Sequence, residues 1–254
     1  MEHRKYDRLV VAVAETEEAL GVAVAEAFAE AVRGALEGKD SIAVILATGN
    51  SQLSFIRAAT ERDDIDWSRI TVLHMDEYLG MSADHPASFR RWMRENVADR
   101  VALKAFEGVR GDHEPVEEEL QRYDRLLRDL DPDICVMGIG ENGHLAFNDP
   151  PADFDAEDLI RIVDMDEMSR KQQVGEGHFR SLDEAPRQAL SLTIPALLRP
   201  RVVLVGVPEA RKALAVKAAL EGPVTPRCPA SILREQSHAR LFLDSEASSL
   251  LDAR

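Results

Sequence analysis

The densest group of chemically useful residues lies in a glycine-rich stretch over residues 133–151. An apolar run over residues 134–139 has the length of a strand, and it leads into a series of closely spaced glycines. His144 and Asp149 follow, and two prolines close the stretch. Titratable groups in this order are typical of the carboxyl end of a strand in an open α/β sheet, where ligands bind. The stretch therefore predicts a small-molecule site with an imidazole and a carboxylate.

The glycine spacing, Gly138-x-Gly140-x-x-Gly143, also fits a dinucleotide-binding fingerprint, with Asp164 about twenty residues further on. That fingerprint needs a helix that opens at the third glycine, so that its N-terminus meets the pyrophosphate. The residues after Gly143 are too few and too rich in proline to form such a helix, so we reject this interpretation. A tight loop with a merely hydrogen-bonded histidine is the remaining alternative to a functional site.

A second polar group follows an earlier apolar run over residues 42–47. It consists of Thr48, Gly49, Asn50 and Ser51, and a predicted helix comes directly after it. Backbone N–H groups and hydroxyls at such a turn can hold a phosphate. The alternative is an ordinary N-cap of the helix by Asn50 or Ser51.

A third apolar run, over residues 70–75, leads into Asp76 and Glu77. Adjacent side chains on a strand point to opposite faces, so one carboxylate can face the crevice while the other faces away. In a parallel sheet the strand ends share one edge, so Asp76, His144 and the 48–51 turn can converge. A phosphate anchor, one carboxylate and one imidazole suit proton transfer on a phosphorylated sugar.

Strands and helices alternate along the chain and position these groups. Continuous apolar strands suit a parallel sheet that is covered on both faces. We predict a single α/β domain over residues 1–254, doubly wound and Rossmann-like, with a mostly parallel central sheet and helices on both faces. The predicted strands are residues 9–14, 42–47, 70–75, 134–139, 159–163, 189–194, 202–207 and 239–244, and the predicted helices are 15–36, 52–61, 85–97, 114–130, 208–220 and 246–251, with a short helix from Pro195 and a helical turn at 228–233.

Residues 164–187 form a polar segment that contains Arg170, Lys171, Gly175 and His178. Such a composition predicts a mobile lid over the site. A surface helix and loop without a role is the alternative.

Composition limits the classes of partner. The chain has 254 residues and a net charge of −15, so nucleic acid and anionic membrane are excluded as partners. An anionic substrate would need a local basic pocket. Aromatic residues make up only 5% of the chain, so the core must rely on Val, Leu, Ile and Ala.

The two cysteines, Cys135 and Cys228, form no metal-binding motif, and Cys135 lies in an apolar strand. The N-terminus is charged and lacks an apolar signal region. No apolar run has membrane-spanning length. These features predict a cytoplasmic protein without a metal site.

Several blocks resemble the glucosamine-6-phosphate deaminases. Residues 75–80 (Met-Asp-Glu-Tyr-Leu-Gly) with 85–88 (His-Pro-Ala-Ser) are similar to one block of that family, and residues 138–148 resemble a second. Residues 47–51 are similar to the family's phosphate loop, and residues 210–222 to a later helix. The blocks occur in order over nearly the whole chain.

The resemblance implies a cofactor-free and metal-free conversion of glucosamine 6-phosphate and water to fructose 6-phosphate and ammonium. Asp76 matches the family's base, which moves a proton between C2 and C1 of the opened sugar. His144 matches the residue that opens the pyranose ring, with help from Asn142 and Asp149. Lys212 matches a phosphate ligand beside the Thr48–Ser51 loop.

The sequence departs from the family at two points. Asp149 stands where the well-known deaminases have Glu, and we expect the backbone of residues 148–151 to bring the shorter acid close enough. The family's phosphate-binding arginine has no clear match, because neither Arg170 nor Arg180 can be assigned to it.

Two other functions stay open at this point. One is a 6-phosphogluconolactonase, a class in the same superfamily that lacks the Met-Asp-Glu-Tyr block. The other is a sugar-phosphate sensor without turnover, which would not need both Asp76 and His144. Self-association into a homo-oligomer is compatible with the sequence.

Overall fold

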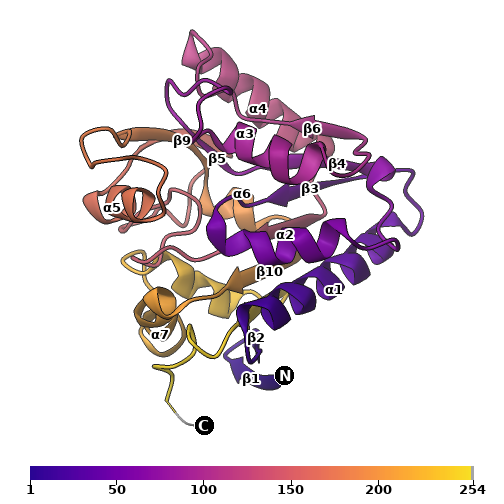
Figure 1. Cartoon of the computed structure of the whole chain (residues 1–254), viewed down its shortest axis with the longest axis vertical. Coiled ribbons are helices and arrows are strands. Elements are labelled where there is room, and N and C mark those ends of the chain that lie inside the picture. Colours follow the sequence, from indigo (N-terminus) through magenta and orange to yellow (C-terminus); the bar gives the residue numbers. More distant parts are fainter. Residues whose placement is uncertain (253–254) are drawn as a thin grey trace.

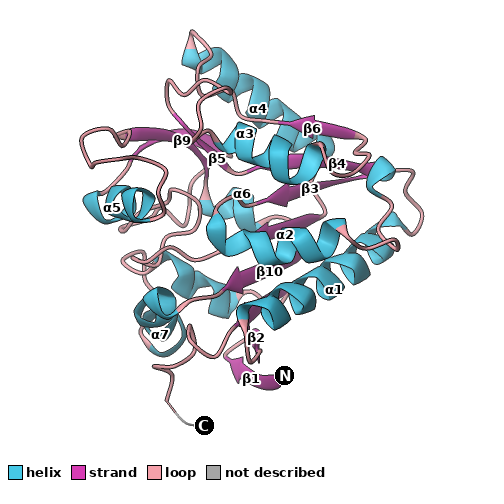
Figure 2. Ribbon diagram, viewed as in Figure 1, coloured by secondary structure: helices cyan, strands magenta, loops and turns pink. Residues whose placement is uncertain are grey.

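The computed structural model describes residues 1–252, so the last two residues of the predicted 1–254 domain lie outside it. A central sheet has the strand order β1-β2-β11-β10-β7-β3-β4-β6 (Figure 2). Its neighbouring strands are parallel, except for the antiparallel pair β1 and β2. The predicted mostly parallel central sheet is therefore confirmed. Its strands are β1 (Glu2–Tyr6), β2 (Leu9–Val13), β3 (Ile42–Leu46), β4 (Ile70–His74), β6 (Ala105–Glu107), β7 (Ile134–Met137), β10 (Val202–Val207) and β11 (Ala239–Leu243).

Helices cover both faces of this sheet (Figure 1). Alternate strand residues point to opposite faces and enter two apolar cores. On β3, Val44 and Leu46 join the core with α1 and α2, whereas Ile45 joins the core with α4, α6 and α7. The doubly wound arrangement is thus as predicted. The helices are α1 (Glu17–Leu36), α2 (Leu53–Thr60), α3 (Phe89–Met93), α4 (Val116–Leu130), α5 (Glu167–Gly175), α6 (Ile194–Leu198) and α7 (Ala213–Glu221), with 3-10 segments at Asn50–Gln52, Trp67–Arg69, Ala210–Lys212 and Pro229–Glu235 and a π-helix at Arg94–Ala98.

A second, antiparallel sheet has the order β5-β9-β8 and consists of β5 (Asp76–Tyr78), β9 (Gln188–Leu192) and β8 (Ile160–Asp164). β8 and β9 were predicted as members of the mostly parallel sheet, and β5 was predicted as a continuation of β4. Only Met75 separates β4 from β5, so there is no crossover that could return the chain beside β4. The chain instead leaves the central sheet and pairs with β9. Asp76 therefore lies where the two sheets meet.

Two strands were not predicted, and two predicted helices differ from the structure. β1 and β6 were not predicted, since both are short edge strands with charged residues. The helix predicted over residues 246–251 is a series of turns. Six residues are too few to offset helix nucleation, and the Asp244 carboxylate accepts a hydrogen bond from Ala247 N (2.7 Å), which forms a turn directly after β11. The helix predicted from residue 85 begins at Phe89, and Ser88 is its N-cap.

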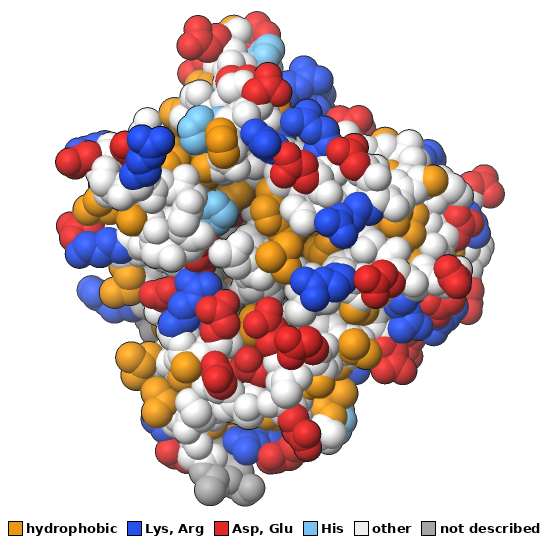
Figure 3. Space-filling view, in the orientation of Figure 1, with side chains coloured by type: hydrophobic (Ala, Val, Ile, Leu, Met, Phe, Trp, Pro, Cys, Tyr) orange, Lys and Arg blue, Asp and Glu red, His pale blue; other side chains and the backbone are white. Residues whose placement is uncertain are grey.

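The surface fits the acidic composition. Acidic and basic side chains are interspersed over the face in Figure 3, without a continuous basic area there. Within residues 1–252, no helix is long and apolar enough to span a membrane. Any anion bound on the face shown must therefore be held by local groups.

Candidate active site

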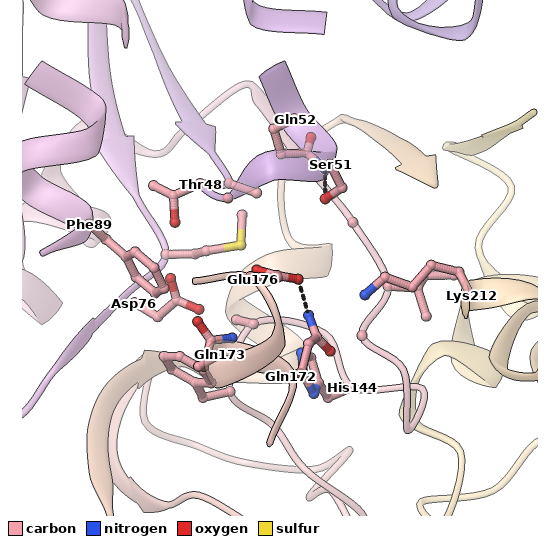
Figure 4. A pocket seen from close by; sticks show the side chains of 18 residues that line it. Thr48, Ser51, Gln52, Asp76, Phe89, His144, Gln172, Gln173, Glu176 and Lys212 are labelled. Carbon is pink, nitrogen blue, oxygen red and sulfur yellow. Dashed lines mark hydrogen bonds between the residues drawn. The ribbon is translucent and has the colours of Figure 1, made fainter. Parts of the chain in front are cut away.

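A pocket lies at the carboxyl ends of β3, β4 and β7 (Figure 4). The predicted convergence of the strand ends is therefore confirmed as geometry. Two predicted residues, Asn142 and Asp149, lie behind His144 rather than in the lining. Asn50 is exposed and donates a hydrogen bond to the Glu176 carbonyl oxygen (3.4 Å). The predicted residues that line the pocket are Thr48, Gly49, Ser51, Asp76, His144 and Lys212.

The turn after β3 has no side-chain cap. Gly49 has a φ of 100°, in the region that favours glycine. It precedes the 3-10 segment, and neither this segment nor α2 has a side-chain N-cap hydrogen bond. The alternative of a cap by Asn50 or Ser51 is therefore wrong. The backbone N–H groups of residues 49–51 donate no hydrogen bond within residues 1–252, so they are available to an anion.

Lys212 approaches the same end of the pocket from the segment before α7 (Figure 4). Its side chain is buried, with only 2% of the residue exposed. No hydrogen-bond partner of its ammonium group is found within residues 1–252. Burial lowers the pKa of Lys212 to about 8, although the negative charge of Glu176 partly opposes this. An anion in the pocket would pair with this ammonium group, because buried charges are stabilised by partners.

Asp76 and Glu77 face opposite sides of β5, as predicted. Glu77 is fully buried away from the pocket, and it accepts hydrogen bonds from Ser88 Oγ (2.7 Å) and Arg90 N (2.9 Å) at the start of α3. Asp76 lines the pocket, and its carboxyl group has no hydrogen bond within the described residues. Burial, and secondly the charge of Glu77, raise the pKa of Asp76 to about 8. The Asp76 carboxyl group thus faces the pocket with a raised pKa and without a hydrogen bond among the described residues.

His144 lies on a glycine turn that brings its ring close to the backbone. A Cβ atom at Gly140 would be 2.2 Å from His144 Nε2, so only glycine leaves room for the imidazole. Gly143 has a φ of 86° and is followed by no helix, which agrees with the rejection of a dinucleotide fingerprint. Asn142 Oδ1 accepts a hydrogen bond from His144 N (3.0 Å). Asn142 therefore orients the loop that carries the imidazole.

Asp149 holds the imidazole from behind. Its Oδ1 lies 3.1 Å from His144 Nδ1 and accepts a hydrogen bond from Asn142 Nδ2 (2.9 Å). The expectation that the backbone brings this aspartate within reach is confirmed. Burial acts to raise the pKa of Asp149, but hydrogen bonds from His144, Ser169 and Asn142 outweigh it and keep the pKa below the ordinary value. The result is an ionised acceptor on Nδ1, which leaves Nε2 for the pocket side.

Helix α5 lies inside the predicted 164–187 lid. Together with its C-terminal end, it supplies pocket residues that were not predicted from the sequence. Gln172, Gln173 and Glu176 line the pocket. Glu141 N donates a hydrogen bond to Gln172 Oε1 (3.0 Å), and Tyr78 OH donates one to Gln173 Oε1 (2.6 Å). The segment's polar composition was visible in the sequence, but which side chains face the pocket depends on how α5 docks.

Glu176 introduces a negative charge into the pocket. Its Oε1 accepts hydrogen bonds from Arg211 Nη1 (2.8 Å) and Gln172 Nε2 (2.9 Å). Burial acts to raise its pKa, but the His178 ring (3.5 Å away), the hydrogen bond from Gln172 and the charges of Arg211 and Lys212 lower the pKa to about 2. Glu176 is therefore ionised at neutral pH beside Lys212.

The two arginines considered for the phosphate do not line the pocket. Arg170 is buried and donates hydrogen bonds to the carbonyl oxygens of Leu182 and Ala185, so it organises the lid segment. Arg180 is exposed. Within residues 1–252, no group of three or more His, Cys, Asp or Glu side chains is arranged to hold a metal ion.

An open α/β sheet with a polar pocket at its strand ends defines a doubly wound small-molecule-binding protein. A sequence model described as glucosamine-6-phosphate isomerases/6-phosphogluconolactonase matches residues 15–243. The chain therefore belongs to this family.

Named relatives support the assignment. A glucosamine-6-phosphate deaminase of Exiguobacterium sibiricum is 35% identical over 212 residues, which cover 84% of this chain and 82% of that protein. A deaminase of Streptococcus pneumoniae is 34% identical over 82% of this chain and 86% of its own length.

Solved structures agree. A monomeric glucosamine-6-phosphate deaminase has a TM-score of 0.87 at 29% identity, and the match covers 94% of this chain and 99% of that one. A 6-phosphogluconolactonase from Thermotoga maritima has a TM-score of 0.75 at 22% identity, over 93% of this chain and 99% of its own. At this lower identity the likeness concerns the fold alone.

Proposed function

We propose that this protein is an enzyme that converts glucosamine 6-phosphate and water to fructose 6-phosphate and ammonium. The observation that carries the proposal is the buried carboxyl group of Asp76, which has no hydrogen bond and shares one pocket with His144 and Lys212. Family membership and the named deaminases support the same reaction.

The phosphate end of the pocket is formed by the N–H groups and hydroxyls of the 48–51 turn and by Lys212. The ammonium group of Lys212 supplies the charge, and the turn supplies directed donors. Together they place the sugar with C1 and C2 toward Asp76 and His144. Few protein groups take part in the reaction, so a large part of the rate enhancement comes from holding the sugar in this position.

Asp76 acts as the base that moves the proton between C2 and C1. Its pKa of about 8 keeps it largely protonated at neutral pH. A substrate with a cationic nitrogen at C2 brings an opposite charge close to the carboxyl group, which lowers its pKa and favours the carboxylate. The base is thus formed when the amino sugar is bound.

His144 opens the sugar ring with the nitrogen that Asp149 leaves free. An imidazole that accepts a proton from the C1 hydroxyl and returns one to the ring oxygen acts as base and then as acid. Asn142 orients the loop that carries His144, and Asp149 holds the ring at Nδ1.

The test is ammonium release from glucosamine 6-phosphate, measured beside galactosamine and N-acetylglucosamine 6-phosphates. Rapid ammonium release from one amino-sugar phosphate supports the proposal. Hydrolysis of 6-phosphogluconolactone without ammonium release would instead identify a lactonase. Binding of glucosamine 6-phosphate without turnover would identify a sensor.

We also propose that residues 1–254 act as one domain whose segment 164–187 is a lid, and that the protein works in the cytoplasm. Both cysteines are free, which is compatible with a reducing compartment. Self-association stays a prediction, and sedimentation analysis would decide between a homo-oligomer and the monomeric state of the similar solved deaminase.

A further inference from the structure

The first turn of α5 contacts the acid that holds His144. Asp166 N donates a hydrogen bond to Asp149 Oδ2 (2.8 Å), and Asp166 is the N-cap of α5. Ser169 is buried, with 1% of the residue exposed, and its hydroxyl donates a short hydrogen bond to Asp149 Oδ1. The same hydroxyl oxygen lies 2.8 Å from His144 Nδ1, nearer than Asp149 Oδ1 at 3.1 Å.

The number of available protons fixes the direction of these hydrogen bonds. An ionised carboxylate only accepts, so the single hydroxyl proton of Ser169 is directed to Asp149. The lone pairs of Ser169 Oγ then face His144, so the Nδ1 proton is shared between Ser169 Oγ (2.8 Å) and Asp149 Oδ1 (3.1 Å). The hydrogen bonds thus connect His144 Nδ1–H with Ser169 Oγ–H and Asp149, and they leave Nε2 on the pocket side.

We propose that Ser169 is a positioning residue for His144, so that the docking of α5 completes the ring-opening group. The catalytic consequence rests on the proposed function, whereas the hydrogen-bond arrangement does not. Ser169 does not line the pocket, and it acts through the imidazole.

The opposite end of α5 faces the pocket, so a bound substrate would contact the same helix that holds His144. Gln172 and Glu176 line the pocket within two turns of Ser169. A substrate that contacts them biases the same helix whose first turn holds Asp149 and His144. Pocket residues and the residues that hold the imidazole thus lie on the same short helix.

The variants that test this are Ser169→Ala, Ser169→Cys and the control Lys171→Ala. Cysteine keeps nearly the size of serine but forms weaker hydrogen bonds. Lys171 is on the exposed side of α5, where it pairs with Glu167 (2.5 Å) and contacts neither His144 nor Asp149. A loss of helix stability alone would appear in the control as well.

The first measurement is the exchange of the His144 Nδ1 proton with water, followed by NMR on protein labelled with ¹⁵N histidine. We expect exchange about tenfold faster in Ser169→Ala, the order expected for one lost hydrogen bond, and wild-type exchange in Lys171→Ala. Unchanged exchange in Ser169→Ala would overturn the proposal. If Ser169→Ala does not fold, Ser169→Cys decides by the same criterion.

The second measurement is a double-mutant cycle on ammonium release. Ser169→Ala should lower kcat about tenfold at unchanged KM, and this loss should fall below about twofold in a His144→Gln background, because the two residues act as a unit. Independent, multiplicative losses would overturn a role through His144. A wild-type protein that releases no ammonium contradicts the proposed function instead, and the NMR measurement still decides the role of Ser169.

Discussion

At the scale of single residues, the site depends on two adjacent carboxylates in different environments. Glu77 is surrounded by hydrogen-bond donors at the start of α3, whereas Asp76 faces the pocket without one. The same β5 backbone therefore supplies one structural acid and one acid available for catalysis. Because Asp76 is buried without hydrogen-bond partners, its charged form is destabilised. The protonation state of Asp76 therefore affects both its proposed role as a base and the free energy of unfolding.

Asp76→Asn should keep the fold and reduce ammonium release by about 10²–10⁴-fold, because an amide cannot accept a proton from carbon. The variant should also be more stable than wild type at pH 8. In the wild type, the folded state binds more protons than the unfolded state between the ordinary pKa of 3.8 and about 8, so stability falls as pH rises through this window. Thermal unfolding from pH 4 to 9 should show that the stability difference between Asp76→Asn and wild type grows with pH. Near-wild-type turnover of Asp76→Asn would mean that another residue is the base.

Asp149→Glu should lower kcat rather than improve it. Asp149 Oδ1 already lies 3.1 Å from His144 Nδ1, and an additional methylene in a buried site displaces the carboxylate by roughly 1 Å. A misplacement of this size can cost about 10²-fold. Steady-state kinetics of Asp149→Glu and Asp149→Asn would test this, and a rate for Asp149→Asn equal to wild type would remove Asp149 from the mechanism.

At the scale of elements, the proposed phosphate end of the pocket combines contributions from three segments. The turn after β3 supplies N–H groups, the segment before α7 supplies Lys212, and α5 supplies the opposing charge of Glu176. The balance between Lys212 and Glu176 decides how strongly a phosphate is held, because both charges are largely removed from water.

Lys212→Ala should raise KM for the sugar phosphate, and unphosphorylated glucosamine should be a very poor substrate of the wild type. Phosphate binding to the wild type should also weaken above pH 8, where the ammonium group of Lys212 loses its proton. Titration with inorganic phosphate from pH 6 to 10 would show this decrease in affinity for the wild type, and the decrease should be absent in Lys212→Ala. Equal turnover of glucosamine and its 6-phosphate would refute the anchor.

Glu176→Gln should bind inorganic phosphate more tightly than wild type, by about tenfold, because it removes a negative charge beside Lys212 while keeping the side-chain size. If the main role of Glu176 were instead to hold the lid through Arg211, the variant would bind phosphate more weakly. Calorimetric titration of the two proteins distinguishes the outcomes by sign, and Lys171→Ala serves as the control on the same helix.

At the scale of the whole molecule, the small antiparallel sheet is joined to the central one by a shared core. Leu190 and Leu192 of β9 lie in the same apolar core as Ile45 of β3 and Val205 of β10. This continuity explains how a strand outside the central sheet can hold Asp76 firmly beside the central strand ends.

The shared core predicts that the two sheets unfold together, as expected for one domain. Trp67 and Trp92 both report on the core with α1 and α2, whereas far-ultraviolet circular dichroism reports on all elements. Urea unfolding followed by tryptophan fluorescence and by circular dichroism should give coincident transitions. A separate transition in one signal would indicate two units.

The sequence by itself determined the central strands and the residues at their carboxyl ends. Asp76, His144 and the 48–51 turn each follow an apolar run directly, so local order along the chain was enough to place them at one edge. The closely spaced glycines at 138, 140 and 143 were likewise visible, although only the structure shows that the His144 ring occupies the space beside Gly140.

The tertiary structure alone decided the contribution of α5 and the second sheet. Ser169, Gln172 and Glu176 have no local signal, because their roles depend on which face of a nine-residue helix docks onto loops from distant parts of the chain. Arg170 was a candidate for phosphate until the structure showed its hydrogen bonds to two carbonyl groups. These contacts depend on long-range packing, which cannot be predicted from the order of the residues alone.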